Sequence, residues 1–395
     1  MNRYLQLISR TDPAALVAWL ALAVVGLATI FSCSHGAAGG AEGVKLTVSP
    51  ATFTNQLLWL GLGLLGAATV LAIPLRFFET FAFVLYGLAL AALVAVFLIG
   101  PERAGTHRWL VLGPLSLQPS EVAKVAVIFA LARFLAAGNG RHPFLTVLGV
   151  LGLCLPPFLL VLKEPDLGTA LVFLAMGVPM MFFAGVRGTF LLALASPFLS
   201  GMVMFYGQEV LSSTWPWALY FIGLLAALFF SRLYMFQSLL LVTANLAVGL
   251  GVPLLWERLK PYQQDRILTF FKPQEGDLLG TGYQVFQSKV AIGSGGILGK
   301  GWLEGTQKGL AFLPERHTDF IFSVVGEELG LWGTLMVVGL FAVLVARSLR
   351  IATQAKSSFA GLLAVGVGTY FFFQSFVNIS ITLGLLPVTG LPLPL

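Results

Sequence analysis

The chain has 395 residues, of which 57% are hydrophobic and 10% are charged, and its mean hydropathy is +0.90. This composition excludes a water-soluble globular domain and is typical of a protein with many membrane spans. The formal net charge of +6 would favour anionic partners in a soluble protein. Here much of that charge lies in short loops between apolar runs, where lysine and arginine set the orientation of the spans, so no nucleic-acid binding is inferred.

Eleven apolar runs follow one another along the chain. Each is expected to form a helix, because a backbone inside a membrane must satisfy its own hydrogen bonds. The predicted fold class is therefore all-α: a polytopic membrane helix bundle that forms a single membrane domain over residues 1–395. The sequence stops at PVTGLPLPL just after the last run, where one further helix is expected. The runs lie at about 13–33, 53–74, 80–100, 120–137, 144–162, 168–186, 189–206, 215–231, 235–255, 318–346 and 359–386.

The longest polar segment, residues 256–317, separates the ninth run from the tenth. Between Trp256 and Arg316 it contains eight basic and six acidic side chains. Connections of roughly sixty residues are generally functional or disordered, and the aromatic content of this one argues against disorder. With the N-terminus inside, ten basic residues flank the inner ends of the runs and four lie in short outer loops. This asymmetry predicts a cytoplasmic N-terminus and an extracytoplasmic position for the long loop.

Charged residues open the fourth run in the motif QPSEVAK. Glu121 and Lys124 are three residues apart, so they lie on one helix face within pairing reach. A purely structural explanation is an ion pair, with Ser120 capping the helix. Ionisable groups at membrane depth are nevertheless functional-site hypotheses by default, and both explanations stay open.

A second cluster lies between the fifth and sixth runs in LKEPDLGTA. Pro165 ends one helix and Asp166 can cap the next, which leaves Lys163 and Glu164 at the outer mouth. A lysine beside a helix N-terminus can hold an anionic group, because backbone N–H groups and the ammonium point to one place.

The third cluster is PERHTDFIFSVVGEELG, which opens the tenth run. Asp319 begins the helix, and Glu327 and Glu328 follow roughly 13 Å further along its axis. Two adjacent acids at that depth need partners. Because neighbouring residues on a helix point in different directions, at most one of these two glutamates is expected to face a site.

Two other patterns carry less functional information. IGSGGILGKG (292–301) resembles a phosphate-binding loop, but Ser294 and Gly301 stand where that motif needs Gly and Ser or Thr. It can offer backbone N–H groups to phosphate or serve as a flexible connector. YQVFQSKVAI (283–292) fits an amphipathic helix that either lies on the outer leaflet or packs against the top of the bundle.

The four histidines show no metal-ligand spacing.

Five separated motifs occur in order from about residue 100 to the end: THRWLVLGPLSLQPSEVAK, LKEPDLGTA, DLLGTGYQVFQSKVAIGSGGILGKGW, GTQKGLAFLPERHTDFIFSVVGEELG and LPVTGLPLPL. Together they resemble the SEDS family of bacterial peptidoglycan glycosyltransferases. The arginine in FLPERHTDFIF and the second proline in GLPLPL are more similar to the rod-shape (elongation) branch than to the division branch.

The resemblance implies an enzyme of the cytoplasmic membrane that polymerises lipid II into glycan strands on the outer face. It also implies a class B penicillin-binding protein as transpeptidase partner. The family's essential acid corresponds to Asp277, as general base or transition-state stabiliser, while basic groups or a divalent cation (Mg²⁺ or Mn²⁺) would neutralise the pyrophosphate. By motif, the substrate cavity would be lined by Arg108, Trp109, Gln118, Ser120, Glu121, Lys124, Lys163, Glu164 and Asp166, with Arg316, His317 and Asp319 beside the exit of the loop. Lys124 and Lys163 are the expected phosphate partners.

The sequence also departs from the family pattern. Four apolar runs, instead of two, separate the KEPD motif from the long loop, so residues 187–255 are expected to contain an extra helix pair. An added pair preserves the side of the membrane on which Asp277 lies. Two other functions stay open: a flippase or transporter of a lipid-linked precursor, since buried charges also suit alternating access, and a scaffold in which the charged clusters are structural.

Overall fold

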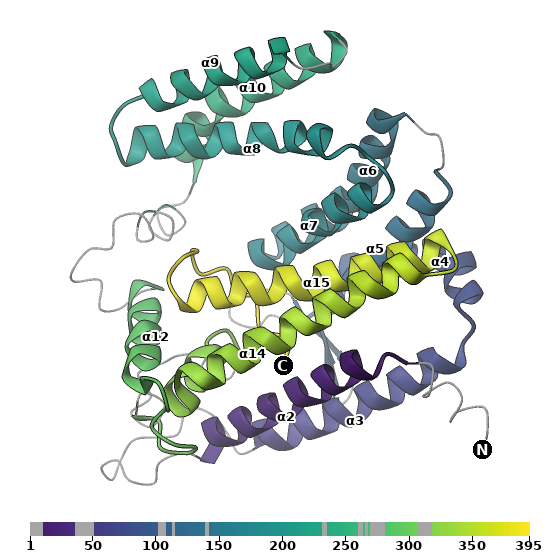
Figure 1. Ribbon diagram of the computed structural model, residues 1–395, viewed down its shortest axis with the longest axis vertical. Helices are drawn as coiled ribbons and strands as arrows, with labels where there is room; N and C mark the ends of the chain where they lie inside the picture. The colour runs from purple at the N-terminus through teal and green to yellow at the C-terminus, as the bar shows by residue number, and fades with distance from the viewer. Residues whose placement is uncertain are drawn as a thin grey trace. The chain divides into compact units, whose positions relative to one another are not determined.

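The computed structural model describes residues 11–35, 51–101, 108–112, 115–138, 142–230, 235–259, 264, 268, 281–306 and 318–395 (Figure 1). A helix coincides with every predicted apolar run, which confirms the predicted all-α membrane fold. The eleven helices are α2 (Pro13–His35), α3 (Ala51–Ala72), α4 (Leu75–Ile99), α5 (Pro119–Ala136), α6 (Pro143–Lys163), α7 (Leu167–Phe183), α8 (Gly188–Glu209), α9 (Trp215–Phe230), α10 (Met235–Arg258), α14 (Ile321–Gln354) and α15 (Ser358–Thr382). Eight of them are long and apolar enough to cross a membrane, as expected of a multi-pass membrane protein.

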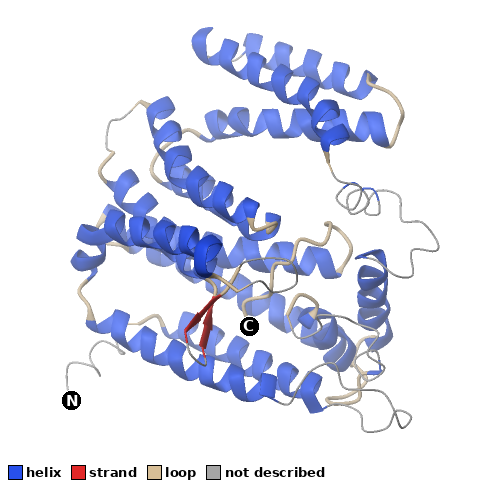
Figure 2. Cartoon of the chain, turned by 180° about the vertical axis from the view of Figure 1, so that it is seen from behind, coloured by secondary structure: helices blue, strands red, loops and turns tan. Residues whose placement is uncertain are grey.

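A small hairpin contains the only strands in the part of the chain that the structure describes (Figure 2). Strands β1 (Leu110–Leu112) and β2 (Leu115–Leu117) pair antiparallel, with Leu110 opposite Leu117. The sequence places these residues in a loop and predicts no strand there. Each strand has only three residues, too few for alternation of apolar and polar side chains to show.

The chain divides into two compact units, residues 185–282 and the remainder. In the larger unit, helices α5, α7 and α15 pack against one another in the interior. Small residues allow this close approach, as is usual between membrane helices. At Gly366 of α15, an added Cβ would lie 2.5 Å from Ile128 of α5 and 3.1 Å from Met180 of α7. The predicted single membrane domain, with an extra helix pair in residues 187–255, stays a prediction.

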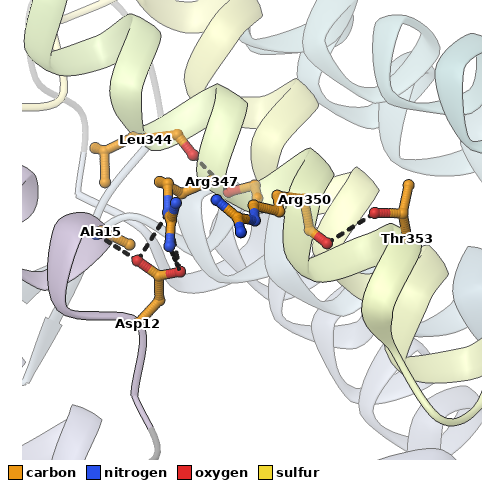
Figure 3. A network of polar contacts seen from close by, with 7 residues as sticks. Asp12, Ala15, Leu344, Arg347, Arg350 and Thr353 are labelled. Carbon is orange, nitrogen blue, oxygen red and sulfur yellow. Dashed lines mark hydrogen bonds and ion pairs between the residues drawn. The ribbon is translucent and has the colours of Figure 1, made fainter.

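Helix α2 packs antiparallel along α14 and is held at both ends by polar contacts. Near its C-terminal end, Ser32 Oγ donates to Glu328 Oε1 at 2.6 Å. At its start, Asp12 caps the helix by accepting from the backbone N–H of Ala15, and both its oxygens accept from Arg347 Nε at 2.9 Å (Figure 3). These hydrogen bonds, chiefly the one from Arg347, hold the pKa of Asp12 below its usual range. Apolar residues of both helices fill the space between these contacts.

Helix α14 is interrupted at Gly330, where φ is 65° and ψ is −157°. The glycine-rich run after α12 (Thr281–Gly295) fills the interruption. Lys300 N and Gly301 N donate to the carbonyls of Glu327 and Glu328, while Leu331 N donates to Gly296 O at 2.9 Å. The glycine-rich run therefore supplies partners for a broken helix, and two of its N–H groups donate to carbonyls of α14.

Helix α12 covers the predicted amphipathic segment 283–292. Ser288 is fully buried, with its Oγ 2.6 Å from Ser323 Oγ of α14 and donating at 2.6 Å to the carbonyl of Thr382 at the end of α15. The sequence allowed this helix either to lie on the outer leaflet or to pack against the bundle. The contacts of Ser288 show that it packs against the bundle. Phe286, on the other side of the helix, is 61% exposed.

Candidate functional site

Lys124 lies at the centre of one polar cluster, in the first turns of α5, and its side chain is 1% exposed. Its ammonium donates to Glu121 Oε1 at 2.8 Å and to Gln374 Oε1 of α15 at 3.2 Å, and it lies 5.1 Å from the centre of the Tyr370 ring. The ion pair expected from the three-residue spacing is therefore present. An ammonium has three N–H donors, and these three groups surround it, an arrangement that stabilises a buried charge.

Ser120 does not cap α5 as the structural explanation required. The residue at the cap position is Gln118, whose side chain makes no capping hydrogen bond. Ser120 is 1% exposed, and its hydroxyl has no hydrogen-bond partner among the described residues. A buried unpaired hydroxyl costs roughly 1–3 kcal/mol, so this group is a candidate to meet a ligand or a water molecule.

Arg108 holds the KEPD turn between α6 and α7. Its Nε and Nη2 each donate at 2.8 Å, to the carbonyls of Glu164 and Pro165 respectively, and Nη1 lies 4.0 Å from Asp166 Oδ2. Asp166 Oδ1 accepts from Thr169 N at 3.0 Å, which confirms the predicted cap. The guanidinium thus fixes the backbone of the turn through the carbonyls of Glu164 and Pro165.

Glu164 is a buried acid with an unused oxygen. The residue is 3% exposed, and its Oε1 has no hydrogen-bond partner within the described ranges. Burial, and secondarily the neighbouring Asp166 carboxylate, raises the pKa of Glu164 to about 7, against a smaller opposing effect of Arg108. The acid can therefore hold or release a proton near neutral pH.

Lys163 lies beside an aromatic ring. Its ammonium lies 5.2 Å from the centre of the Phe97 ring on α4. Trp109 directly precedes strand β1 and is partly exposed. The catalytic candidate Asp277 and the neighbouring candidates Arg316 and His317 lie outside the described residues.

The segment after α15 connects several of these candidates. Asn378 Nδ2 donates to the carbonyls of Asp319 (2.9 Å) and Leu391 (2.7 Å), and Gln374 Nε2 donates to Pro392 O at 3.0 Å. At Gly168, two residues after Asp166, an added Cβ would lie 2.7 Å from the carbonyl of Thr389. Residues 389–392 therefore bring together the surroundings of Lys124, Asp166 and Asp319.

Sequence reasoning missed Gln374, Asn378 and Thr389. The first two are 2% and 0% exposed, and their spacing of four residues places them on one face of an otherwise apolar helix. That spacing, followed by a proline-rich segment with few N–H donors, was a usable signal. The Asn378 Oδ1 and Thr389 Oγ1 atoms have no partner in the described parts of the chain, like Ser120 Oγ and Glu164 Oε1.

The paired glutamates of α14 have structural partners. Glu327 Oε1 accepts from Lys300 Nζ at 2.8 Å and from Thr306 N at 2.7 Å, and Glu328 accepts from Ser32 as described above. Both acids are almost fully buried. These contacts stabilise the interruption of α14 and the start of the segment that leads into residues 307–317.

Comparison with known proteins gives one consistent family. The profile of the FtsW/RodA/SpoVE family, described as cell cycle proteins, matches residues 13–217 and 216–395. The chain is 38% identical to the peptidoglycan glycosyltransferase MrdB of Escherichia coli K12 over 386 residues, covering 97% of this chain and 87% of MrdB. It is 34% identical to the probable peptidoglycan glycosyltransferase FtsW of Trichlorobacter lovleyi, covering 86% of this chain and 76% of that protein.

A solved structure shares the fold. It is a chain of a peptidoglycan synthase complex that coordinates polymerization and crosslinking, with 31% identity and a TM-score of 0.66, covering 98% of this chain and 91% of that one. The family profile and both relatives extend across the two compact units. The chain therefore belongs to the FtsW/RodA/SpoVE, or SEDS, family of peptidoglycan glycosyltransferases.

Proposed function

We propose that this chain polymerises lipid II into glycan strands during cell elongation and so maintains cell shape. The observation that carries the proposal is the 38% identity to MrdB, itself named a peptidoglycan glycosyltransferase, over 97% of this chain. The elongation role is favoured over the division role because the arginine in FLPERHTDFIF and the second proline in GLPLPL resemble the rod-shape branch. In addition, MrdB is more similar to this chain than the FtsW relative is, at 34% identity over 86% of the chain. Division-type activity is the alternative within the family.

Asp277 is proposed as the general base, or as the group that stabilises the transition state, at the attacking sugar hydroxyl. In that step the hydroxyl oxygen bonds to the anomeric carbon of the donor sugar, and its proton passes to the carboxylate. The bond from that carbon to the polyprenyl pyrophosphate breaks, and the pyrophosphate leaves with the electron pair. Positive charge must then stabilise the leaving group.

Arg108 and Lys163 are proposed as the cations that meet the pyrophosphate. The Arg108 side chain is 29% exposed, and Lys163 is also exposed, whereas the Lys124 ammonium is surrounded by Glu121, Gln374 and Tyr370. The contacts of Lys124 favour a positioning role over direct phosphate binding. Ser120, Glu164 and Thr389 supply the unpartnered polar atoms of the proposed cavity.

A divalent cation is proposed only as an ion that would bind together with the pyrophosphate of the substrate. Within the described ranges, no group of three or more His, Cys, Asp or Glu side chains is placed to hold a metal ion. Mg²⁺ is commonly bound by one or two carboxylates together with substrate phosphates, so the substrate itself would provide part of the coordination. When bound, the ion would supply positive charge to the leaving group.

The proposed location is the bacterial cytoplasmic membrane, with a cytoplasmic N-terminus and the active site on the outer face. The excess of lysine and arginine at the inner ends of the spans supports this orientation. The proposed partner is a class B penicillin-binding protein, supported by the likeness to a chain of a synthase complex that coordinates polymerization and crosslinking.

The test is glycan-strand synthesis from purified lipid II by the full chain in complex with its partner. We expect Asp277→Asn to lower the rate by about 10²–10⁴-fold, the range attributed to a positioned acid or base. Asp265→Asn, which removes another acid from the same loop, is the matched control and should retain activity. Equal amounts of folded protein are compared by size-exclusion chromatography.

Three other outcomes would contradict this assignment. Equal synthesis by wild type and Asp277→Asn would show that Asp277 is not the catalytic acid. No synthesis by either protein, together with passage of lipid II across vesicle membranes, would favour the transporter. No activity of either kind, with intact binding of the partner, would favour the scaffold.

A further inference from the structure

The smaller unit contains a polar cleft at one end of its three helices. Helices α8 and α10 run in the same direction, since Gly201 approaches Val248 and Val252 and the rings of Phe205 and Trp256 meet edge to face at 4.9 Å. The cleft lies where both helices end and has a volume of about 580 Å³. It is lined by Gln208, Glu209, Ser212, Ser213, Thr214, Pro253, Trp256 and Glu257.

The chemistry of this lining selects among ligands. Two carboxylates, Glu209 and Glu257, contribute to it, and none of the described lining residues is basic. A phosphate or carboxylate ligand would therefore lie beside the like charge of the exposed Glu257, which disfavours binding. An amide and three hydroxyl groups can donate and accept hydrogen bonds, the carboxylates accept them, and Trp256 offers a flat apolar surface. A neutral molecule with many hydroxyl groups and an apolar ring face fits this combination, and the volume lies in the usual range for ligand sites, roughly 300–1,000 Å³.

The turn that forms one wall of the cleft is held in a strained conformation. Ser212 has φ = 52°, a left-handed conformation that is uncommon for a residue with a side chain. It is fixed on both sides, because Leu211 N donates to Tyr206 O at 3.2 Å and Ser213 N donates to Gly207 O at 2.8 Å. Strain that the surrounding structure maintains is found preferentially at functional sites.

The opposite wall is also fixed before any ligand binds. Besides the contact with Phe205, the carbonyl of Trp256 accepts from Gln264 Nε2 at 2.8 Å. Below the cleft, Asn245 is fully buried, and its amide joins the three helices by accepting from Tyr220 OH at 3.0 Å and donating to Ser196 Oγ at 2.8 Å. A preorganised site loses less entropy when a ligand binds.

We propose that this cleft is a saccharide-binding site that takes a neutral N-acetylhexosamine unit of a glycan strand. The choice of sugar rests on the proposed function, whereas the saccharide chemistry rests on the lining. Trp256 and Glu257 lie in the last turn of α10, directly before the long segment that carries Asp277, so the cleft lies at the end of α10 from which that segment leaves. The site would hold the strand apart from the reacting sugar.

Binding of chitotetraose, a neutral β-1,4-linked tetramer of N-acetylglucosamine, tests the proposal. Saturation-transfer NMR on the full chain with its partner in nanodiscs would give the Kd. We expect Glu257→Gln, an exposed position, and Trp256→Ala each to raise the Kd at least about tenfold. Trp215→Phe, which changes an exposed tryptophan outside the cleft lining, should leave the Kd unchanged. Trp256→Ala also removes packing against Phe205 and could prevent folding. In that case Glu257→Gln alone still tests the proposal.

The alternative occupant is a cationic amine, for which spermidine is the probe. Spermidine binding that Glu257→Gln abolishes, without chitotetraose binding, would overturn the proposal. So would chitotetraose binding that both cleft variants leave unchanged, or no chitotetraose binding at all. Lipid II polymerisation by the same preparations separates the two proposals: synthesis without cleft binding refutes only the saccharide site, and cleft binding without synthesis refutes only the glycosyltransferase function.

Discussion

Replacing Gly330 with alanine is expected to lower the free energy of unfolding by about 3 kcal/mol or more, because strain and overpacking add at this position. Its φ of 65° is costly for any residue with a side chain. An alanine Cβ would also lie 2.3 Å from Gly299 N and 2.6 Å from Ile297 O. Both atoms belong to the backbone of the glycine-rich run, so no side-chain rotation can relieve the contact.

Gly339→Ala is the matched control in the same helix. Nothing lies within 4 Å of an added Cβ at Gly339, and alanine is favoured over glycine inside a helix by roughly 0.5–1 kcal/mol. Thermal unfolding of both variants in detergent, with the yield of monodisperse protein, measures the difference. Equal melting of Gly330→Ala and wild type would show that the interruption of α14 can close and that the glycine-rich run is not required to fill it.

Glu164→Gln is expected to stabilise the protein at alkaline pH and to remove part of its pH dependence. The pKa of Glu164 is about 7 in the folded chain, above the ordinary value of 4.5. Between these two values the unfolded chain loses a proton that the folded chain keeps, so the wild type loses stability as the pH rises through this window. Glutamine resembles the protonated acid, and at pH 8 the gain should reach up to about 3 kcal/mol, since one pKa unit corresponds to about 1.4 kcal/mol.

Unfolding midpoints at pH 5 and pH 8, measured at one heating rate, test this prediction. Wild type and Glu164→Gln should differ little at pH 5 and clearly at pH 8. Glu304→Gln, at an exposed acid, should follow the wild type at both values. A variant that is less stable than wild type at pH 8 would mean that the Glu164 carboxylate is satisfied by a partner that glutamine cannot replace.

Local features of this fold could be predicted from the sequence. The lengths of the apolar runs give the helices, the three-residue spacing gives the Glu121–Lys124 pair, and the position of Asp166 before an apolar run gives a helix cap. Each of these depends on residues that are close together in the sequence. The local geometry of a helix and of its cap is the same in any protein, so the sequence pattern is sufficient to predict these features.

Features that depend on distant residues could not be predicted in this way. The partner of Glu328 is Ser32, almost three hundred residues earlier. The sequence of the glycine-rich run is equally compatible with a flexible connector, and only the structure shows its pairing with α14. The contacts of Gln374 and Asn378 with residues 391 and 392 likewise require the packed bundle. Asp277, Arg316 and His317 are assigned to the site by their resemblance to the family motifs, and these assignments stay predictions.

The antiparallel contact between α2 and α14 determines the order in which the protein can be completed. Helix α2 is synthesised before the other described helices, yet both its polar anchors, Arg347 and Glu328, lie in α14, which follows most of them in the chain. During that time the Arg347 guanidinium is not available to the Asp12 carboxylate. The contacts between α2 and α14 can therefore form only after residue 347 has been synthesised, whereas the packing of α2 against α3 needs no residue of α14.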